Sequence, residues 1–399
     1  MKFRRGINYW PATTAMHWWR RFDATEVRND FDRIHRAGFD SVRIFLLWEH
    51  FQPAPGQVSD SALRRLVDVA DVAACCQLSL VVTLYTGHMS GVNWIPEWAL
   101  GADTRGARFR TISRGQVTAA SLRNWYEDPL LLAAQVLLAR EVARALASHN
   151  AVWAYDLGNE NSNCVIPDSR DSAARWLDAI TSAIRSIDSN RPITIGLHAE
   201  DLEQDRHLGP REAARVCDFL CMHGYPMYAK WSAGPDDERV LPFLGLITHW
   251  LGERDVLFEE FGAPAVRDRS RVLLNGESPV LLEEEQAAHF TRRALYGLHE
   301  AGLSGAMLWC FADYAEPLWQ EAPFDQAVHE RYFGLWRSDY SEKPSLTEVT
   351  RFLNRTRLEP QEQLEWINIS PKTFYQNPLN NLRRLYGAFC ESRTRAEVR

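Results

Sequence analysis

The sequence predicts an α/β protein built as a (β/α)8 TIM barrel with a short C-terminal extension. Three observations lead to this prediction: the chain has 399 residues, it contains eight short apolar segments, and a helix-length segment follows each of them. Parallel strands that are buried on both faces read as nearly continuous apolar runs, and eight alternating units close into a barrel. A doubly wound open sheet is the alternative, but the first apolar segment ends at residues 8–11 without the glycine-rich phosphate loop typical of that fold.

The first strand is expected over residues 3–9, and a helix follows it. Asp23 at the N-cap and Glu26 three residues later form the pattern of a capping box. Val27 and Phe31 then begin an apolar stripe with helical spacing. The seven later strands are expected over residues 41–46, 78–84, 151–157, 193–197, 219–222, 256–258 and 305–309. Helices are expected over residues 60–76, 129–148, 172–187, 242–251 and 282–301, with a last one that begins near residue 345.

Residues 1–355 account for the eight units and are expected to form one catalytic barrel. Residues 356–399 remain as a C-terminal extension that mixes charged residues with Trp366, Tyr375 and Tyr386. A solvated tail rarely carries so many aromatic side chains, so the extension is expected to pack on the barrel.

Composition and charge exclude several classes of function. The 45 Lys and Arg against 52 Asp and Glu give a formal net charge of −7, which argues against nucleic acid or a membrane surface as a partner. The first residues lack the apolar core of a signal peptide, so a cytoplasmic protein is expected. The seven cysteines contain no CxxC pair, which favours buried thiols in a reducing compartment. The sequence leaves the oligomeric state open.

In a barrel of this kind the chemistry takes place at the carboxyl ends of the strands. Neither a metal nor another cofactor is expected, because no HxH, GxSxG or phosphate-loop pattern occurs there. The alternative is a zinc site formed by His88, His198 and His223. Two carboxylates that face each other across the barrel mouth suit glycoside hydrolysis, where one is the acid and the other the nucleophile. The residues that follow the eight apolar runs are Asn8, Trp48, Glu49, Thr86, His88, Asn159, Glu160, His198, Glu200, His223, Tyr225, Glu259, Glu260 and Trp309.

The residues at these strand ends resemble those of clan A glycoside hydrolases, most of all family 5. Gly158-Asn159-Glu160 after the fourth strand is similar to the family's acid/base motif, and Glu260-Phe261-Gly262 after the seventh is similar to its nucleophile motif. Arg43 on the second strand, His223-Gly224-Tyr225 after the sixth and Trp309 on the eighth match further family positions. The five matched points occur in the family's order and cover nearly the whole predicted barrel.

The resemblance implies a role for each matched residue. Glu160 is expected to be the general acid/base, and Glu260 the nucleophile that forms a glycosyl-enzyme intermediate. Asn159 is expected to bind the sugar 2-hydroxyl, a contact that strengthens in the transition state. Arg43 and Tyr225 are expected to hold and ionise the nucleophile, because a cation and a hydrogen-bond donor both favour a carboxylate.

Other residues are expected to support these groups or to bind the sugar. His223 is expected to tune Glu160, and Trp309 to offer an apolar face to the sugar. The fifteen tryptophans of the chain are a heavy load, and part of them is expected to form a sugar-stacking surface. The further residues expected to bind or support the substrate are His88, His198, Trp48 and Trp94.

Structural alternatives remain for several of these residues. Glu259 is a rival nucleophile, but the family pattern places the nucleophile directly before Phe-Gly and therefore favours Glu260. Arg43 can instead be a purely structural ion-pair partner. Packing without any contact to substrate is the alternative for His88, His198, Trp48 and Trp94.

The substrate is expected to be a β-mannoside or another short β-linked oligosaccharide or glycoside. Residues 87–98 and 197–200 resemble the β-mannosidase and mannanase members of family 5. The long insert over residues 87–128 is expected to wall off one end of the cleft, which favours action at chain ends. The alternatives are an endo-β-1,4-glucanase or mannanase, a transglycosylase that uses the same two glutamates, and a non-catalytic carbohydrate-binding barrel.

Overall fold

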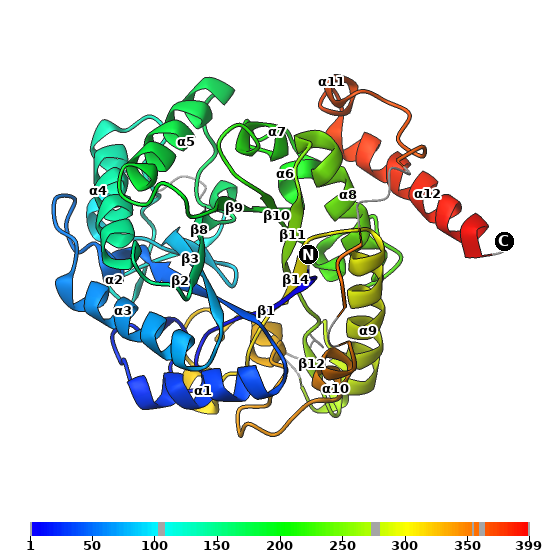
Figure 1. Cartoon of the computed structure of the whole chain (residues 1–399), viewed down its shortest axis with the longest axis horizontal. Coiled ribbons are helices and arrows are strands. Elements are labelled where there is room, and N and C mark those ends of the chain that lie inside the picture. The colour runs from blue at the N-terminus through cyan, green and yellow to red at the C-terminus, as the bar shows by residue number, and fades with distance from the viewer. Residues whose placement is uncertain (1, 103–107, 273–279, 353–354, 359–363, 398–399) are drawn as a thin grey trace.

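Eight parallel strands close into a barrel, which confirms the predicted fold class (Figure 1). The computed structural model describes residues 2–102, 108–272, 280–352, 355–358 and 364–397. Because neighbouring strands run parallel, all their carboxyl ends meet at one mouth of the barrel. Around the barrel the strands are β1 (Arg4–Asn8), β14 (Gly305–Leu308), β11 (Val256–Phe261), β10 (Leu220–His223), β9 (Ile193–His198), β8 (Val152–Asn159), β3 (Ser79–Thr86) and β2 (Ser41–Leu47).

Helices surround the barrel on its outer side (Figure 1). They are α1 (Ala24–Arg36), α2 (Trp48–Phe51), α3 (Asp60–Cys75), α4 (Pro129–Leu146), α5 (Arg170–Arg185), α8 (Val240–Gly252), α9 (Glu284–Glu300) and α10 (Pro344–Arg351). Between β9 and β10 the chain forms only the short turns α6 (Glu200–Glu203) and α7 (Pro210–Ala213).

The capping box expected at the start of α1 is only half formed. The Asp23 carboxylate accepts hydrogen bonds from the backbone N–H groups of Thr25 and Glu26, as expected of an N-cap. The Glu26 carboxylate does not reach back to Asp23, because it accepts a hydrogen bond from the Thr13 hydroxyl at 2.5 Å instead.

A buried polar network fills the barrel interior just below its mouth. Arg43 Nη2 donates to Asp156 Oδ2 at 2.7 Å, and Arg43 Nε donates to Thr83 Oγ1 at 2.8 Å. The Thr83 hydroxyl in turn donates to Asp156 Oδ2 at 2.6 Å, and all three side chains are fully buried. A charge in such a place needs partners. Asp156 therefore holds one side of the Arg43 guanidinium and leaves its other side directed at the strand ends.

The insert after β3 forms a small sheet beside the barrel mouth. Its strands are β4 (His88–Met89), β5 (Val92–Trp94), β6 (Arg110–Ser113) and β7 (Gln116–Thr118), in the order β4-β5-β6-β7. Because both residues of β4 line the cavity at this mouth, the sheet places the insert against the site.

The C-terminal helices α11 (Pro371–Phe374) and α12 (Pro378–Glu397) lie at one edge of the molecule, near α8 (Figure 1). The rings of Tyr386 and Phe389 lie 5.1 and 5.7 Å from the ring of Phe243 in α8. The Tyr386 hydroxyl also donates to Asp237 Oδ2 at 2.5 Å. The division of the chain into two parts at residue 355 stays a prediction.

The structure bears on the predicted environment of the chain in two ways. Cys217, Cys221 and Cys310 are buried, whereas Cys75 is exposed. Across the residues that the structure describes, no helix combines the length and apolar character needed to span a membrane. The cytoplasmic location stays a prediction.

Candidate active site

Glu160 stands at the barrel mouth because the chain turns sharply at the end of β8. Gly158 has φ +144°, and a Cβ there would meet the Asn161 side chain at 2.2 Å. Glu160 itself has φ +48°, in the left-handed region that non-glycine residues adopt at a cost of about 1–3 kcal/mol. Asn159 is fixed by both ends of its amide, since Oδ1 accepts from Arg43 Nη2 at 3.0 Å and Nδ2 donates to the His88 carbonyl at 3.0 Å.

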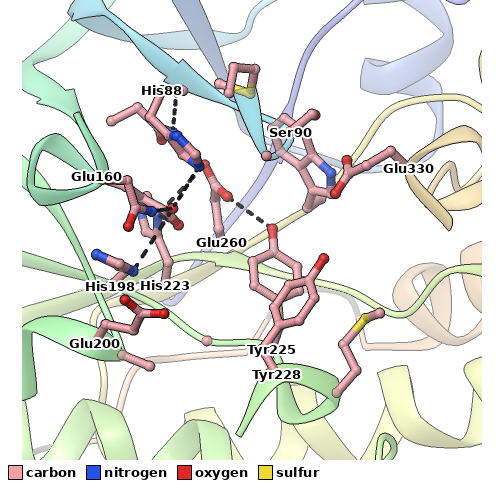
Figure 2. A pocket seen from close by; sticks show the side chains of 18 of the residues that line it. His88, Ser90, Glu160, His198, Glu200, His223, Tyr225, Tyr228, Glu260 and Glu330 are labelled. Atoms are coloured by element: carbon pink, nitrogen blue, oxygen red, sulfur yellow. Dashed lines mark hydrogen bonds and ion pairs between the residues drawn. The ribbon is translucent and has the colours of Figure 1, made fainter. Parts of the chain in front are cut away.

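Glu260 on β11 receives two hydrogen bonds from the residues expected to hold it. Arg43 Nη1 donates to Glu260 Oε1 at 2.5 Å, and the Tyr225 hydroxyl donates to Oε2 at 2.9 Å, as the dashed line in Figure 2 marks. Burial raises the pKa of Glu260, while the cationic groups of His223 and Arg43 and the Tyr225 hydroxyl act in the opposite direction. Both carboxylate oxygens are therefore fixed in place.

The carboxylates of Glu160 and Glu260 face each other at short range. One oxygen of each lies within 4.8 Å of the other, and a ring nitrogen of His223 lies within the same distance of both. These three groups form the one set of potential metal ligands found among the described residues. The Arg43 guanidinium already places a positive charge against Glu260, and that charge disfavours a cation in this position.

His223 connects the carboxylates at the mouth with those inside the barrel. Its Nδ1 lies 3.1 Å from Glu160 Oε1, and its Nε2 lies 3.2 Å from Glu259 Oε2. Burial alone lowers the pKa of His223, but Glu260, Glu160 and Glu259 outweigh burial and raise the pKa from 6.5 to about 10. The ring is therefore a cation at neutral pH, and each of its N–H groups donates to a carboxylate.

His223 and His198 also shift the pKa of Glu160. Burial favours the neutral form of this carboxyl, but the positive charges of His198 and His223 and the hydrogen bond from His223 lower its pKa. The shared proton accordingly lies on His223 and not on Glu160.

Glu259 and Glu260 are adjacent, yet both point toward the barrel axis. Neighbouring residues of a regular strand point to opposite faces. Here the pairing of β11 with β10 and β14 shifts register, between Met222 and His223 on one side and between Phe258 and Phe261 on the other. Glu259 is fully buried and lies 3.4 Å from Arg43 Nε, whereas Glu260 lines the cavity.

A cavity of about 620 Å³ opens at this mouth. Eight of the eleven side chains that the sequence predicts for the site line it, and Arg43 lies beneath its floor, bonded to Glu260. The eight are His88, Asn159, Glu160, His198, His223, Tyr225, Glu260 and Trp309.

Comparison with known protein families assigns this chain to a family. The family described as Cellulase (glycosyl hydrolase family 5) matches residues 6–285. The chain belongs to glycoside hydrolase family 5. It is therefore a glycoside hydrolase, and the resemblance noted in its strand ends is confirmed.

Several solved structures resemble this family 5 chain. A GH5_18 variant from Streptomyces cattleya in complex with Manb1-4GlcNAc is 23% identical, covers 90% of this chain and 82% of its own, and has a TM-score of 0.73. A GH5_18 protein from Bifidobacterium longum subsp. infantis is 22% identical, with 90% and 80% covered and a TM-score of 0.73. These two likenesses concern the fold. No curated protein matches the sequence significantly.

An exo-beta-1,4-mannosidase from Opitutaceae bacterium strain TAV5 is also similar. It is 26% identical, with a TM-score of 0.71, and the match covers 88% of this chain and 59% of the mannosidase chain. The family 5 chain described here thus spans less than two thirds of that protein.

His88 and His198 both approach Glu160 in this family 5 chain. Nε2 of His88 and Nδ1 of His198 each lie 3.9 Å from Glu160 Oε2. His88 Nδ1 lies 2.8 Å from Asn93 Oδ1, and burial lowers the pKa of His88. His198 Nε2 lies 2.9 Å from the Ser162 hydroxyl. Both rings are thus held against the same carboxylate oxygen.

The structure departs from the sequence-based expectation for Trp48 and Trp94. Trp48 is fully buried, its Nε1 donates to Gln52 Oε1 at 2.8 Å, and its ring packs edge-on against Trp98. Trp94 is 2% exposed and its ring packs edge-on against His17. Neither lines the cavity, because each side chain turns into the core behind the strand ends. Trp309 is the tryptophan among the described residues that reaches the cavity.

Sequence reasoning missed Glu330, which lines the cavity although it follows β14 by some twenty residues. Its local sequence carries no signal, since it lies in an irregular segment far from any strand end. It also missed Arg108 of the insert, which forms a bidentate ion pair with Glu200 across the cavity rim. Glu200, the second residue after β9, is already among the strand-end residues named from the sequence, but no local pattern pairs it with Arg108.

Proposed function

We propose that this chain is a retaining β-glycosidase that removes terminal sugars from β-mannosides or other short β-linked oligosaccharides. One observation carries the proposal: an oxygen of Glu160 and an oxygen of Glu260 lie within 4.8 Å of each other in one cavity. Retaining glycosidases hold their two carboxyl groups about 5–5.5 Å apart, whereas inverting enzymes need about 6.5–9.5 Å to admit a water molecule. The short separation supports double displacement.

In the first step Glu260 attacks the anomeric carbon as the C–O bond to the leaving group breaks. Arg43 and Tyr225 hold Glu260 in place and leave one lone pair to form the new bond. Glu160 protonates the departing oxygen. In the second step water attacks the same carbon, Glu160 takes the proton from that water, and Glu260 leaves as a carboxylate.

His223 supplies the proton that Glu160 needs. Its cationic ring places Nδ1–H 3.1 Å from Glu160 Oε1, so one transfer converts the ion pair into a neutral acid and a neutral imidazole. A bound sugar that displaces water from the cavity favours this neutral pair, because desolvation penalises the charged forms. In the second step the proton that Glu160 takes from water returns to His223.

Asn159 and Trp309 complete the sugar site in this proposal. The Asn159 amide already donates to the His88 carbonyl and accepts from Arg43, so its position is fixed before a sugar 2-hydroxyl arrives. Trp309 lines the cavity and offers its ring to the C–H face of the sugar.

Action at chain ends is supported by four contacts that join the segments after β3, β9, β10 and β14 into a ring. Arg110 of β6 pairs with both oxygens of Asp325, at 2.8 and 2.7 Å, and so joins the insert to the segment after β14. The ion pair of Arg108 with Glu200 joins the insert to the segment after β9. The last two contacts are hydrogen bonds of 2.7 Å, between the Tyr228 hydroxyl and His329 Nε2 and from Trp231 Nε1 to Glu203 Oε1. A closed ring admits a sugar end more readily than the middle of a long chain.

The choice of β-mannosides rests on the relatives. The Opitutaceae protein is an exo-beta-1,4-mannosidase, and the Streptomyces cattleya structure contains Manb1-4GlcNAc. A disaccharide of that kind is small enough for a cavity of about 620 Å³.

The experiment is incubation with 2,4-dinitrophenyl 2-deoxy-2-fluoro-β-mannoside, with the glucoside as a comparison, followed by intact-mass and peptide analysis. The expected result is the mass of one fluorosugar on the peptide that contains Glu260. Turnover of aryl β-mannoside without any covalent adduct, and with inverted product, would contradict the retaining mechanism.

A further inference from the structure

Glu330 is a buried carboxyl group of the cavity that the proposed reaction leaves unused. It lies in the short 3-10 turn η7 (Val328–Tyr332), within the segment that follows β14, and it is only 7% exposed. It lines the same cavity as Glu160 and Glu260. Burial, with the negative charges of these two glutamates, raises its pKa to about 7, although hydrogen-bonding contacts with Ser90 and Trp309 oppose that shift.

Glu330 lacks the cationic partner that a buried carboxylate ordinarily has, and its neighbours Ser90 and Trp309 offer it neutral donors alone. Among the described residues no lysine or arginine pairs with it, and the nearest cationic candidate is His329, whose Nε2 lies 3.6 Å from Glu330 Oε1. That ring is neutral at ordinary pH, because burial lowers its pKa to about 4, and its Nε2 is already bonded to the Tyr228 hydroxyl. In the described part of the chain Glu330 Oε2 and the Ser90 hydroxyl both lack a hydrogen-bond partner of standard geometry. Buried polar groups without partners are rare and call for an explanation.

The position of Glu330 indicates which part of a substrate it meets. In Figure 2 Glu330 and Ser90 lie on one side of Glu260, whereas His198 and Glu200 lie on the other side together with Glu160. Glu160 protonates the leaving oxygen, so the leaving group extends toward its side. The sugar that is transferred to Glu260 therefore occupies the side of Glu330.

The far edge of that sugar is the edge that Glu330 faces. In a pyranose ring C4 lies opposite the anomeric carbon, and the 3-hydroxyl and the 6-hydroxyl flank the 4-hydroxyl. The bidentate pair of Arg110 with Asp325 joins the insert to the segment that carries Glu330, and this end of the ring is thereby closed. A further sugar on the 4-hydroxyl would meet the buried carboxyl group.

We propose that Glu330 binds hydroxyl groups at the far edge of the terminal sugar, and so makes the site specific for a non-reducing chain end. The inference rests on the proposed function and adds the residue that reads the sugar end. Sugar hydroxyls donate hydrogen bonds to the carboxylate and supply a partner for Oε2, which has none of standard geometry among the described residues. Hydrogen bonds from hydroxyls to a charged acceptor are among the stronger ones in a desolvated site.

The test combines enzyme variants with deoxy substrates. The wild type, Glu330→Gln and Glu330→Ala are assayed on 4-nitrophenyl β-mannoside and on its 3-deoxy, 4-deoxy and 6-deoxy analogues. For the wild type, kcat/KM is expected to fall at least about 100-fold on one or more analogues. Both variants are expected to lose a similar factor on the parent glycoside but only a few-fold more on that same analogue, because the bond is already gone.

Two controls separate this role from a structural one. Glu316→Gln changes an exposed glutamate of the same segment and is expected to leave kcat/KM on all four substrates unchanged. Glu330→Gln keeps the shape of the side chain, so its melting temperature is expected to match the wild type within a few degrees.

Two results would overturn the inference. If the losses from the variant and from every deoxy substrate multiply, Glu330 does not bind these hydroxyls, and the proposed function stands without it. If the wild type cleaves none of the aryl β-glycosides, the proposed function fails and the inference fails with it.

Discussion

Replacing each of the two adjacent glutamates of β11 by alanine separates catalysis from folding. Glu260→Ala removes a side chain that lines the cavity and leaves an anion-sized space beside the guanidinium of Arg43 and the hydroxyl of Tyr225. Activity on an aryl β-mannoside is expected to fall by about five orders of magnitude or more, the scale seen when a covalent nucleophile is removed. Azide fits that space and is expected to restore part of the activity and to yield a glycosyl azide of inverted configuration.

Glu259→Ala is expected to act on stability instead. Its carboxylate is fully buried between Arg43 and His223, and removing one partner of a buried charge network costs about 3–5 kcal/mol. With an unfolding entropy of about 2.1 cal/mol/K per residue, 399 residues give about 0.84 kcal/mol/K, so Tm falls by about 4–6 °C. Azide is not expected to rescue this variant, because Glu259 does not line the cavity.

The assay is the release of nitrophenol with and without sodium azide, together with thermal unfolding of each variant. Azide rescue of Glu259→Ala, with none for Glu260→Ala, would reverse the assignment of the nucleophile. Equal melting temperatures for Glu259→Ala and the wild type would refute the account of the buried network.

Three further predictions follow from the site. Tyr225→Phe removes the hydrogen bond to Glu260 Oε2. Because hydrogen bonds to a charged group contribute about 1.5–3 kcal/mol, kcat/KM is expected to fall about 10–100-fold. An unchanged kcat/KM would show that this hydroxyl does not help the nucleophile. The pKa of His223 is raised from 6.5 to about 10, so the stability that its charge contributes is complete below pH 6.5 and is lost as the pH rises toward 10. The decline of Tm over this range is therefore expected to be shallower in His223→Asn than in the wild type. Parallel curves of Tm against pH for the two proteins would contradict this account. Arg110→Gln breaks the bidentate pair with Asp325 and opens the ring at this contact. Hydrolysis of mannotetraose by this variant is therefore expected to release mannobiose as well as mannose. Mannose as the sole initial product would argue that the pair does not block the cleft.

The residues of the central site could be predicted because they stand at strand ends. A run such as residues 152–157 predicts a buried strand, and a closed parallel barrel brings the carboxyl ends of all its strands together. Asn159, Glu160 and Glu260 therefore lie at the same mouth of the barrel, whatever the length of the helices between their strands. The match of the chain to family 5 confirms the class of chemistry that these positions imply.

The same reasoning could not decide which way a side chain turns beyond the strand end. Trp48 begins the short helix α2 and turns inward to donate to Gln52, and Trp94 lies in the small sheet of the insert. Both indoles follow strands in sequence, but local packing takes them away from the cavity. Glu259 is a similar case, since an irregular register brings it inward beside Glu260.

The sequence by itself predicted the barrel, because a barrel depends on periodicity and on the order of strands along the chain. It also indicated the family and the pair of catalytic carboxylates proposed here, because the motifs at the strand ends resemble those of family 5. Only the tertiary structure decided the ring around the cavity and the place of Glu330. Arg110 meets Asp325, and Tyr228 meets His329, across more than 100 residues of chain in each case. Such contacts depend on where separate loops lie in space, and no local pattern in either segment encodes that.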